Sequence, residues 1–439
     1  MPLSAIAHHP DRVALSNELH ARPFPVLRAP SRAASIAIER DTNGSEAYRD
    51  HLLALLDRYG AAHPGPDAAH HSADLGMVRL KWERHSEFCT FTLFAEGVSE
   101  VPFDGGLFEY FPDNWLADAP GRLLSSILVR LEYAASQEAV IARVSEVGSE
   151  WFHTEAVAAS FVLERDAAIV GDFRLDAHEH IRFAVFQVGE TGANRMGRIV
   201  QRLIEIETYK TMAMLTLPIA RDVFSRLSDL DRDLAQVVRE MTDAHENAQD
   251  ELDRLLHISG RVENFSADSA FRFTAAEAYS ALVHERVNVL REERLAGYQL
   301  FSEFMMRRFE PAMRTCRSAS RRLSDISGRA ARASDLLATR VSVDADERNR
   351  QILKQMDTRA ALQLRLQETV EGLSVVAISY YGVNLLAKLL APVADPLGVS
   401  QKALGAGLVL PVVLVVWLGV HKIRKQAEKR AETAPAGNR

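Results

Sequence analysis

The sequence has 439 residues, of which 47% are hydrophobic and 25% charged, as in an ordinary folded protein. This length is too great for a single small hydrophobic core and indicates roughly two or three structural units. Its formal net charge is −7, and general nucleic-acid binding needs a basic surface to displace counterions, so we expect no nucleic-acid partner. The two cysteines, Cys89 and Cys316, form no Cys-x-x-Cys pair, which excludes a thiolate zinc or redox motif and favours reduced, packed thiols.

The first thirty residues contain histidines, charged residues and prolines but no apolar stretch of the signal-peptide kind, so we expect no cleaved export signal. Their most distinctive pair is His20 and Arg22, which stand between Glu18 and Pro23. An imidazole and a guanidinium together could hold an anionic ligand. The alternative is an extended segment, fixed by proline, that packs as a strap on a sheet.

Residues 1–190 are predicted to form a sheet domain, because runs with period-two patterning and many β-branched or aromatic side chains favour strands. The runs are residues 33–39, 75–82, 88–94, 127–133, 156–164, 167–175 and 180–188. Short connections such as 176–178 favour antiparallel pairing. The spacing of leucines predicts one helix at 46–59, and residues 61–74 are predicted to be a loop.

Asp176, His178 and His180 alternate in the last of these connections, so in a strand they would share one face. A carboxylate and two imidazoles could bind a divalent metal ion. The alternative is a solvated hairpin turn between two strands.

Residues 191–371 are predicted to form a helical stalk with coiled-coil character. Apolar residues recur at spacings of three and four from Leu227 to Leu255. A second long helix is predicted from about residue 274 through Met305, and residues 343–373 then enter the first apolar span without a proline. The apolar face of the stalk packs either within one chain or between copies, and periodicity does not separate the two.

Two apolar stretches, residues 372–391 and 403–420, each approach the roughly 20 residues that span about 30 Å of hydrocarbon. Pro392, Pro396 and Gly398 lie between them and favour a turn, so residues 372–420 are predicted to form a transmembrane hairpin. The alternative is a buried hydrophobic hairpin of a soluble protein.

Residues 421–439 are predicted to be a basic cytosolic tail. Its cations are Lys422, Arg424, Lys425, Lys429 and Arg430. The positive-inside rule places this tail in the cytoplasm, and two crossings place the N-terminal domain on the same side. Each cation near the surface adds about 1 kcal/mol of attraction to anionic lipid, so the tail is also expected to contact the bilayer.

The first span carries four polar side chains, Ser374, Tyr381, Asn384 and Lys388, whose spacing allows them to share one helix face. Polar groups in a membrane prefer a bundle interior or a water-filled cavity, so one hypothesis is that they line a pore or a subunit interface. The alternative is hydrogen bonding between helices, with Lys388 extending to the outer headgroups.

Several longer stretches are distinctive. They are NELHARPFPVLRAP (17–30), PFDGG (102–106), NWLADAPG (114–121), GDFRLD (171–176), GRIVQRLIEIETYKTMAMLTLPIAR (197–221) and LRLQETVEGLSVVAISYY (364–381). Together they resemble a bacterial family of uncharacterised membrane-anchored proteins, the domain of unknown function 3422. The resemblance covers nearly the whole chain and implies a bacterial membrane-anchored protein, but it implies no activity. With the positive-inside orientation, we expect a multi-pass protein of the bacterial inner membrane with both termini cytoplasmic.

The domain order also resembles that of CorA-type cation channels, in which a mixed α/β cytosolic domain precedes a long stalk helix and two C-terminal spans. Those channels carry a Gly-Met-Asn motif at the outer end of the first span, and Gly382-Val383-Asn384 falls near that place. Valine replaces the methionine, and Lys388 adds a positive charge where a cation would enter. The architecture therefore carries most of this resemblance.

No Walker-type loop, Gly-x-Gly-x-x-Gly turn, His-Glu-x-x-His helix or Gly-x-Ser-x-Gly elbow occurs, so the sequence gives no positive case for an enzyme and implies no cofactor. The predicted fold is α+β: a mostly antiparallel sheet domain, a helical stalk and a C-terminal transmembrane hairpin. Three functions stay open: a homo-oligomeric membrane-anchored scaffold or regulator, a CorA-like cation channel, and a membrane-tethered enzyme that would use His20, Arg22 and residues 176–180.

Overall fold

The computed structural model describes residues 8–12, 15, 23–40, 45–153, 156–243, 248–394 and 400–432. The chain divides into two compact units, Met1–Asp335 and Leu336–Arg439. The first unit combines a sheet with helices, and the second consists of helices. The predicted α+β fold class is therefore confirmed.

A nine-stranded sheet forms within the described residues of the first unit, in the order β2-β3-β4-β1-β5-β8-β7-β6-β9. The strands are β1 (Ser31–Glu39), β2 (His70–Asp74), β3 (Val78–Arg84), β4 (Phe88–Glu96), β5 (Leu123–Ala134), β6 (Ala158–Val162), β7 (Ala167–Gly171), β8 (Ile181–Val188) and β9 (Glu293–Arg294). Neighbouring strands are antiparallel except β5 and β8, which are parallel. The expectation of a mostly antiparallel sheet is confirmed.

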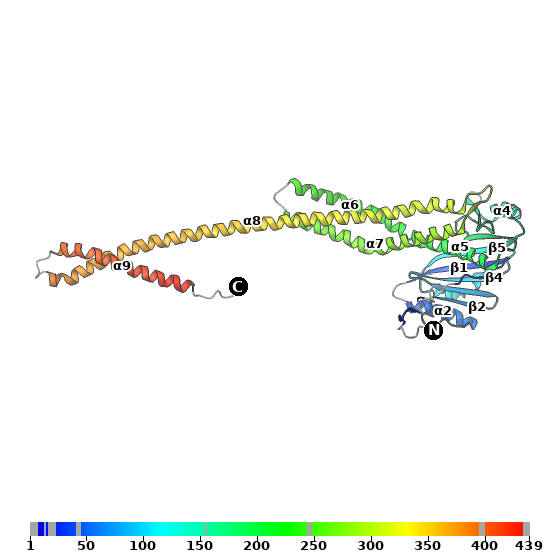
Figure 1. The fold of residues 1–439 in the computed structure, drawn as a ribbon, viewed down its shortest axis with the longest axis horizontal. Coiled ribbons are helices and arrows are strands. Elements are labelled where there is room, and N and C mark those ends of the chain that lie inside the picture. Colours follow the sequence, from blue (N-terminus) through cyan, green and yellow to red (C-terminus); the bar gives the residue numbers. More distant parts are fainter. Residues whose placement is uncertain are drawn as a thin grey trace. The chain divides into compact units, whose positions relative to one another are not determined.

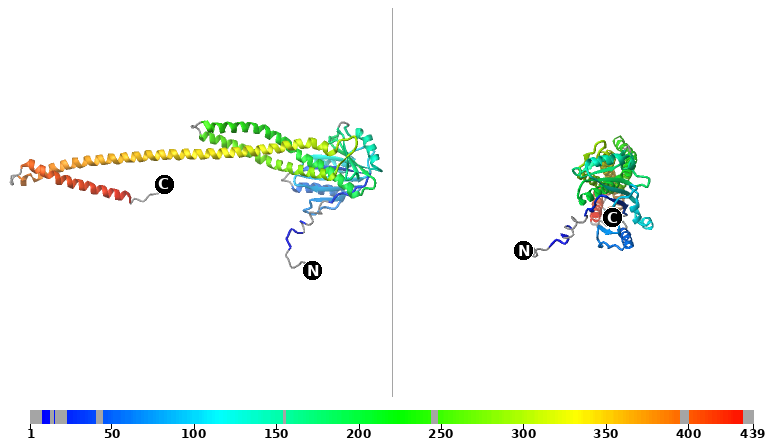
Figure 2. Two further views of the ribbon diagram at one scale, coloured as in Figure 1. Left: turned by 45° about the horizontal axis from the view of Figure 1, so that its top comes forward. Right: turned by 90° about the vertical axis from the view of Figure 1, so that its right-hand side faces the viewer.

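Helices cover both faces of the sheet (Figures 1 and 2). One face carries α2 (Ser45–Tyr59), the 3-10 helix η1 (Gly106–Tyr110), α3 (Asp113–Ala117) and α4 (Gln137–Trp151). Leu52 of α2 and Trp82 of β3 belong to the core below α2, and Val144 of α4 and Phe186 of β8 belong to the core below α4. Burial on both faces explains why a strand such as β7, with the sequence AAIVG, carries no polar side chain.

The helix α5 (Ala193–Met214) covers the opposite face, and its contacts there are partly polar. Lys81 Nζ in β3 donates a hydrogen bond to Gln201 Oε1 of α5 at 2.8 Å and lies 3.2 Å from Glu83 Oε1. The hydroxyls of Ser35 and Thr92 share a 2.8 Å hydrogen bond between β1 and β4. These partners offset the cost of burying polar groups under α5.

The helices α6 (Thr216–Asp243) and α7 (Ala248–Leu290) run side by side, and α8 (Phe301–Ala394) follows them (Figure 1). Leu227, Leu234 and Leu255, which belong to the predicted apolar face, are fully buried in this single chain. Asp231 of α6 lies 2.6 Å from Arg329 of α8. These leucines of the predicted apolar face are therefore buried within one chain, whereas Val238 of the same face is exposed.

Residues 70–74 form the edge strand β2, paired antiparallel with β3, although 61–74 were expected to be a loop. Its sequence HHSAD lacks an apolar alternation. An edge strand with partly exposed faces is held by backbone pairing more than by burial, so the hydrophobic pattern that reveals a strand is missing.

The helix expected from about residue 274 through Met305 is interrupted. α7 ends at Leu290, and Arg291 then adopts a positive φ of 47°. Glu293 and Arg294 pair with β6 before α8 begins at Phe301. Pairing with the distant sheet edge therefore overrides the local helical pattern, which sequence periodicity cannot reveal.

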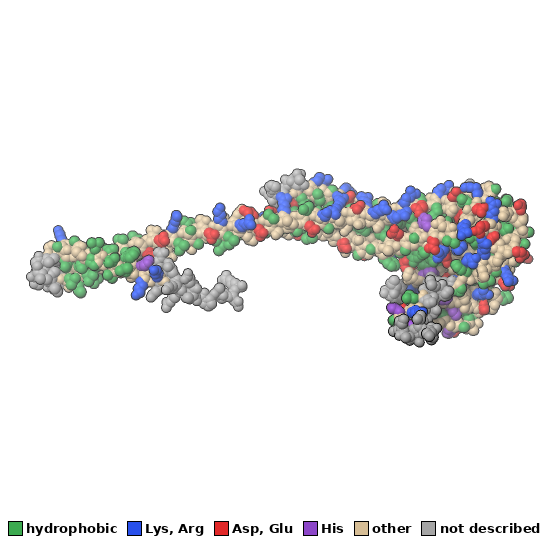
Figure 3. All heavy atoms as spheres, viewed as in Figure 1, with side chains coloured by type: hydrophobic (Ala, Val, Ile, Leu, Met, Phe, Trp, Pro, Cys, Tyr) green, Lys and Arg blue, Asp and Glu red, His purple; other side chains and the backbone are tan. Residues whose placement is uncertain are grey.

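The second unit contains the rest of α8 and α9 (Gln401–Glu432). Two helical stretches, Phe301–Leu390 and Lys402–Ile423, contain windows long and apolar enough to cross a membrane, with mean hydropathies of 1.5 and 2.5. Only 6% of each window is buried. Figure 3 shows the resulting band of apolar side chains along these helices.

Candidate functional site

The first unit contains a pocket of about 540 Å³ on the sheet face that carries α2, η1 and α3, and we call it the sheet pocket. Its lining residues are Ile36, Ile38, Phe103, Asp104, Gly105, Phe108, Glu109, Leu116, Ala119, Gly121, Leu123, Ser126, His178 and His180. They come from β1, β5, the segment 103–121 and the turn before β8. The volume lies within the roughly 300–1,000 Å³ that is usual for small-molecule sites.

A tight turn and the helix η1 that follows it place two carboxylates at this pocket, Asp104 and Glu109. Gly105 has a positive φ of 67°, which glycine adopts without the steric cost of a Cβ. Asp104 Oδ1 accepts a hydrogen bond from the Gly106 N–H at 3.1 Å, and its Oδ2 lies 3.8 Å from Arg32 Nη1. Glu109 is exposed, and within the described residues no hydrogen bond or ion pair holds its carboxylate.

Asp104 carries its negative charge at neutral pH. Burial opposes its ionisation, but hydrogen bonds from the Ser99 hydroxyl and the Gly106 N–H outweigh burial, together with two nearby guanidiniums. The pKa of Asp104 therefore lies below its usual value.

His180 lies on another wall of the sheet pocket and is half-buried. Its Nδ1 lies 2.7 Å from Ser126 Oγ, and its ring centroid lies 4.9 Å from that of Phe108. Burial lowers the pKa of His180, and the Asp176 carboxylate opposes this only in part. The imidazole is therefore neutral at neutral pH. His178, the other imidazole of the pocket, is exposed.

The turn at residues 176–180 does not assemble the predicted divalent-metal ligands. Asp176 Oδ1 accepts hydrogen bonds from the backbone N–H groups of His178 and His180, at 2.8 and 2.9 Å, so it stabilises the turn. The two imidazole centroids are 6.5 Å apart. Across the described residues, no group of three or more His, Cys, Asp or Glu side chains could hold a metal ion. The segment is the hairpin turn that formed the alternative interpretation.

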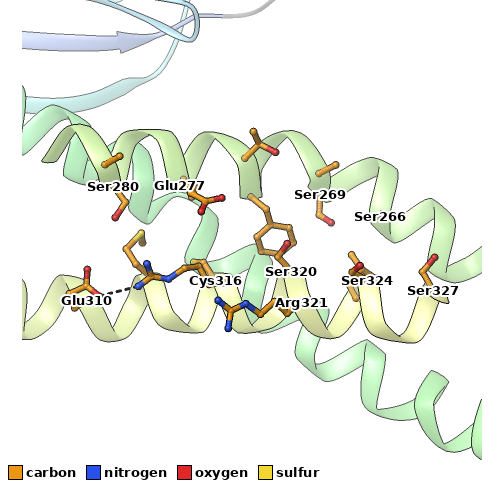
Figure 4. Close-up of a pocket in the computed structure, with 18 of the residues that line it drawn as sticks. Ser266, Ser269, Glu277, Ser280, Glu310, Cys316, Ser320, Arg321, Ser324 and Ser327 are labelled. Atoms are coloured by element: carbon orange, nitrogen blue, oxygen red, sulfur yellow. Dashed lines mark hydrogen bonds and ion pairs between the residues drawn. The ribbon is translucent and has the colours of Figure 1, made fainter. Parts of the chain in front are cut away.

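A second cavity, of about 580 Å³, lies between α7 and α8 in the first unit. Figure 4 shows serine hydroxyls and one labelled carboxylate from each helix around it, Glu277 from α7 and Glu310 from α8, together with Arg321 from α8. Ser266, Ser269, Ser280, Ser320, Ser324 and Ser327 contribute the hydroxyls. We call this cavity the serine groove. The cavity exists because serine and alanine side chains are too small to fill the space between the two helices.

The serine groove lacks the pairing that nucleophilic catalysis needs. His284 Nε2 lies 2.9 Å from Glu310 Oε1, and its Nδ1 lies 2.7 Å from the Ser280 carbonyl oxygen, so both ring nitrogens already have partners. Burial raises the pKa of the Cys316 thiol, which disfavours the reactive thiolate. The groove therefore shows no activated nucleophile among its described residues.

The predicted polar side chains of the first span lie on α8. Ser374 Oγ donates to the Val370 carbonyl at 2.8 Å, and Asn384 Nδ2 donates to the Tyr380 carbonyl at 3.0 Å. Tyr381 and Lys388 are exposed. Two of the four side chains thus donate a hydrogen bond to a carbonyl of their own helix.

A close contact between α8 and α9 lies beside these residues. A Cβ on Gly382 would stand 3.1 Å from Val412 Cγ1 of α9. Ser379, one turn earlier, is also buried. Small residues at three-residue spacing let two helix backbones approach, a signal that the sequence contained and that the search for polar groups missed.

The predicted N-terminal pair and the predicted basic tail lie partly or wholly outside the described residues. His20 and Arg22 lie outside the described residues. The segment 23–28 that follows them lies against α5, where the Leu27 N–H donates to the Ala193 carbonyl at 3.1 Å. In the predicted tail, α9 extends to Glu432. Lys422 and Lys425 on it are exposed, whereas the side chains of Arg424, Lys429 and Arg430 lie outside the described set.

Residues 7–427 match the family described as protein of unknown function DUF3422. The chain belongs to this family. The match contains the sheet, the long helices and both apolar helices, so the apolar hairpin is part of the DUF3422 region. No curated protein matches the chain.

In this DUF3422 chain, residues from two of the stretches that carry the family resemblance, 102–106 and 114–121, line the sheet pocket. Sequence reasoning selected His178 and His180 but missed Asp104 and Glu109. The glycine pair after Asp104 was the available signal, because it marks a tight turn whose N–H groups can hold a carboxylate.

Proposed function

We propose that this DUF3422 protein is a homo-oligomeric scaffold or regulator anchored in the bacterial inner membrane. The hairpin of α8 and α9 is its anchor, and the first unit is its cytoplasmic interaction or sensing module. The sheet pocket and the serine groove are the cavities through which that unit would detect a ligand.

The exposure of the apolar helices carries this proposal. Leu373, Leu385 and Leu410 are 72%, 69% and 81% exposed. In water, a continuous apolar surface of this kind would drive association, whereas in hydrocarbon it has no unfavourable contact with solvent. The low burial also weakens the alternative of a soluble hairpin, because the core helix of a soluble protein would be mostly buried.

The charge distribution supports the orientation. Lys422, Arg424 and Lys425 follow the second apolar stretch directly, and the positive-inside rule keeps such a segment in the cytoplasm. Two crossings then place the first unit on the same side. The basic tail would contact the anionic lipid of that leaflet.

The segment of α8 between the first unit and the apolar span supports self-association. Leu362, Leu366 and Val370 follow one another at four-residue spacing and are 60%, 66% and 56% exposed. From Arg340 to Glu371 the helix carries six basic and six acidic residues, so copies can match charges as well as apolar side chains. Anchoring in one bilayer would hold these helices parallel and close together.

Two experiments test the proposal. Full-length protein should resist extraction from membranes by alkaline carbonate, and light scattering in detergent should give a mass of at least two chains. Leu366→Glu should shift that mass toward one chain, and Leu364→Glu should not, because Leu364 points to the other side of the helix. A single-chain mass for the unmodified protein would contradict self-association.

A CorA-like cation channel is the second candidate, favoured by one observation. α8 runs unbroken from the α+β unit into the first apolar stretch, and one further apolar helix follows. Two spans per chain can enclose a pore only in a ring of several copies. A pentameric mass and cation flux through liposomes that Asn384→Ala abolishes would favour the channel, whereas a dimeric mass would end it.

A further inference from the structure

We propose that the sheet pocket binds an apolar organic cation, a ligand in which a primary or secondary amine is carried on a hydrophobic body. The use of this binding as a signal rests on the proposed function. The binding step itself depends only on the first unit.

The walls of the pocket select an apolar body. Ile36 and Ile38 of β1 and Leu123 of β5 line it with aliphatic side chains, and Phe103 and Phe108 add aromatic rings. Leu123 is 60% exposed, which leaves apolar surface available to a ligand. An apolar ligand would cover this surface and gain the free energy of removing it from water.

The charge of the pocket selects a cation. Asp104 and Glu109 contribute carboxylates, and no Lys or Arg occurs among the residues that line the pocket. Within the described residues Glu109 has no ion-pair partner, so its charge is available to a ligand. The rings of Phe103 and Phe108 can add cation–π attraction. Arg32 offsets part of the charge of Asp104, so the unpaired Glu109 carboxylate leaves the pocket with a net negative charge, which disfavours an anionic ligand.

His180 supplies a neutral polar group next to these carboxylates. Its Nδ1 is engaged by Ser126 Oγ at 2.7 Å, and no hydrogen bond reaches Nε2 from the described residues. Nε2 is also the atom nearest to a Cβ placed on Gly105, at 3.9 Å, so it faces the turn that carries Asp104. In the tautomer whose Nδ1–H donates to Ser126 Oγ, Nε2 can accept a hydrogen bond from an ammonium group.

The wall opposite this turn is held in place by close packing. A Cβ on Gly121 would stand 1.9 Å from the Glu39 carbonyl oxygen, so only glycine fits there. The Tyr48 hydroxyl donates to the carbonyls of Glu39 and Pro120, at 2.8 and 3.2 Å. The segment 114–121 is therefore fixed on the end of β1, and the pocket exists before a ligand arrives, which reduces the entropic cost of binding.

The test uses full-length protein in phosphatidylcholine nanodiscs and three dansyl probes of similar size. Dansylcadaverine carries a primary amine, its N-acetyl derivative is neutral, and dansyl-aminohexanoic acid is anionic. Empty nanodiscs correct for partition into lipid. The amine should bind saturably with one site per chain, and the other two probes should bind at least about tenfold more weakly, since like charges and lost pairing both oppose them.

Substitutions then assign the binding to the sheet pocket. Glu109→Gln should weaken binding of the amine about threefold, the size expected for one exposed ion pair. Leu123→Arg adds a cation inside the pocket and should abolish saturable binding, whereas Leu123→Gln, the neutral change at the same exposed position, should retain it. Equal melting temperatures by tryptophan fluorescence would show that all three variants are folded.

Equal binding of the amine and its acetylated form, tighter binding of the anionic probe, or an unchanged affinity in Leu123→Arg would each overturn the assignment. These outcomes would leave carbonate extraction and oligomeric mass unaffected. Failure of the ligand proposal is therefore distinguishable from failure of the anchored-oligomer proposal.

Discussion

Replacing His51 by phenylalanine should reduce the loss of thermal stability that the first unit undergoes when the pH falls from 7 to 5. The His51 ring is stacked on Trp115, with centroids 3.9 Å apart and planes 14° apart, and it is only 8% exposed. Within the described residues its Nε2 has no hydrogen-bond partner. Burial lowers the pKa of His51 to about 4, although the Asp118 carboxylate opposes the shift. Phenylalanine preserves the stacking and leaves no polar atom unsatisfied.

The sign of the effect follows from proton linkage. Between the usual pKa of about 6.5 and the folded value of about 4, the unfolded chain binds a proton at His51 that the folded chain does not. The stability contribution is therefore complete above pH 6.5 and is lost as the pH falls toward 4. From pH 7 to pH 5 the loss is about 2 kcal/mol, which lowers the melting temperature by roughly 3 °C for a unit of the size Met1–Asp335.

The assay is thermal unfolding of the full-length protein in detergent, followed by tryptophan emission at pH 7 and pH 5. Between these two conditions the melting temperature of the His51→Phe protein should fall by about 3 °C less than that of the unmodified protein. His153→Phe, a change at an exposed histidine, provides the matched control and should keep the original profile. An identical pH profile for His51→Phe and the unmodified protein would refute the assignment of this sensitivity to the buried imidazole.

Two glycine contacts give further predictions. Gly382→Leu should loosen the packing of α8 on α9 by about 1–3 kcal/mol and speed amide exchange in α9 by mass spectrometry, whereas Gly372→Leu, which meets no atom within 4 Å, should not. Equal exchange in the two variants would contradict this contact. Gly197→Ala places a Cβ 1.6 Å from the Pro25 carbonyl oxygen and should lower the melting temperature. Gly260→Ala, in open space within α7, should increase the free energy of unfolding by about 0.5–1 kcal/mol through helix propensity, and so raise the melting temperature. If Gly197→Ala raised the melting temperature as Gly260→Ala does, α5 would not require a glycine at residue 197.

Local patterns in the sequence were sufficient for much of the fold. Runs such as 88–94 alternate and carry β-branched or aromatic side chains, and they became strands because both faces of the sheet are covered. The leucine spacing of 46–59 became α2, and the two apolar stretches became helices. These elements are determined by burial over a short range, which a hydrophobic pattern records directly.

The elements that the sequence did not predict depend on distant partners. β2 is held by its pairing with β3, and the break between α7 and α8 by the pairing of β9 with β6. The sheet pocket is assembled from β1, β5, the segment 103–121 and the turn before β8. No single stretch carries a periodic signal for such a site. For this reason the histidines of the turn were noticed, whereas Asp104 and Glu109 were not.

The orientation of the hairpin is tested most directly by labelling single cysteines in intact cells with a membrane-impermeant maleimide. Exposed positions suited to the introduced cysteine are Met77 in the first unit, Lys402 at the start of α9 and Lys425 beyond the second apolar stretch. The native thiols of Cys89 and Cys316 are buried and give a low background. The proposed topology predicts that Lys402→Cys is labelled once the outer membrane is permeabilised. It predicts that Met77→Cys and Lys425→Cys are labelled only after the inner membrane is opened. Labelling of all three positions in the soluble fraction of lysed cells, or of Lys425→Cys from outside, would contradict it.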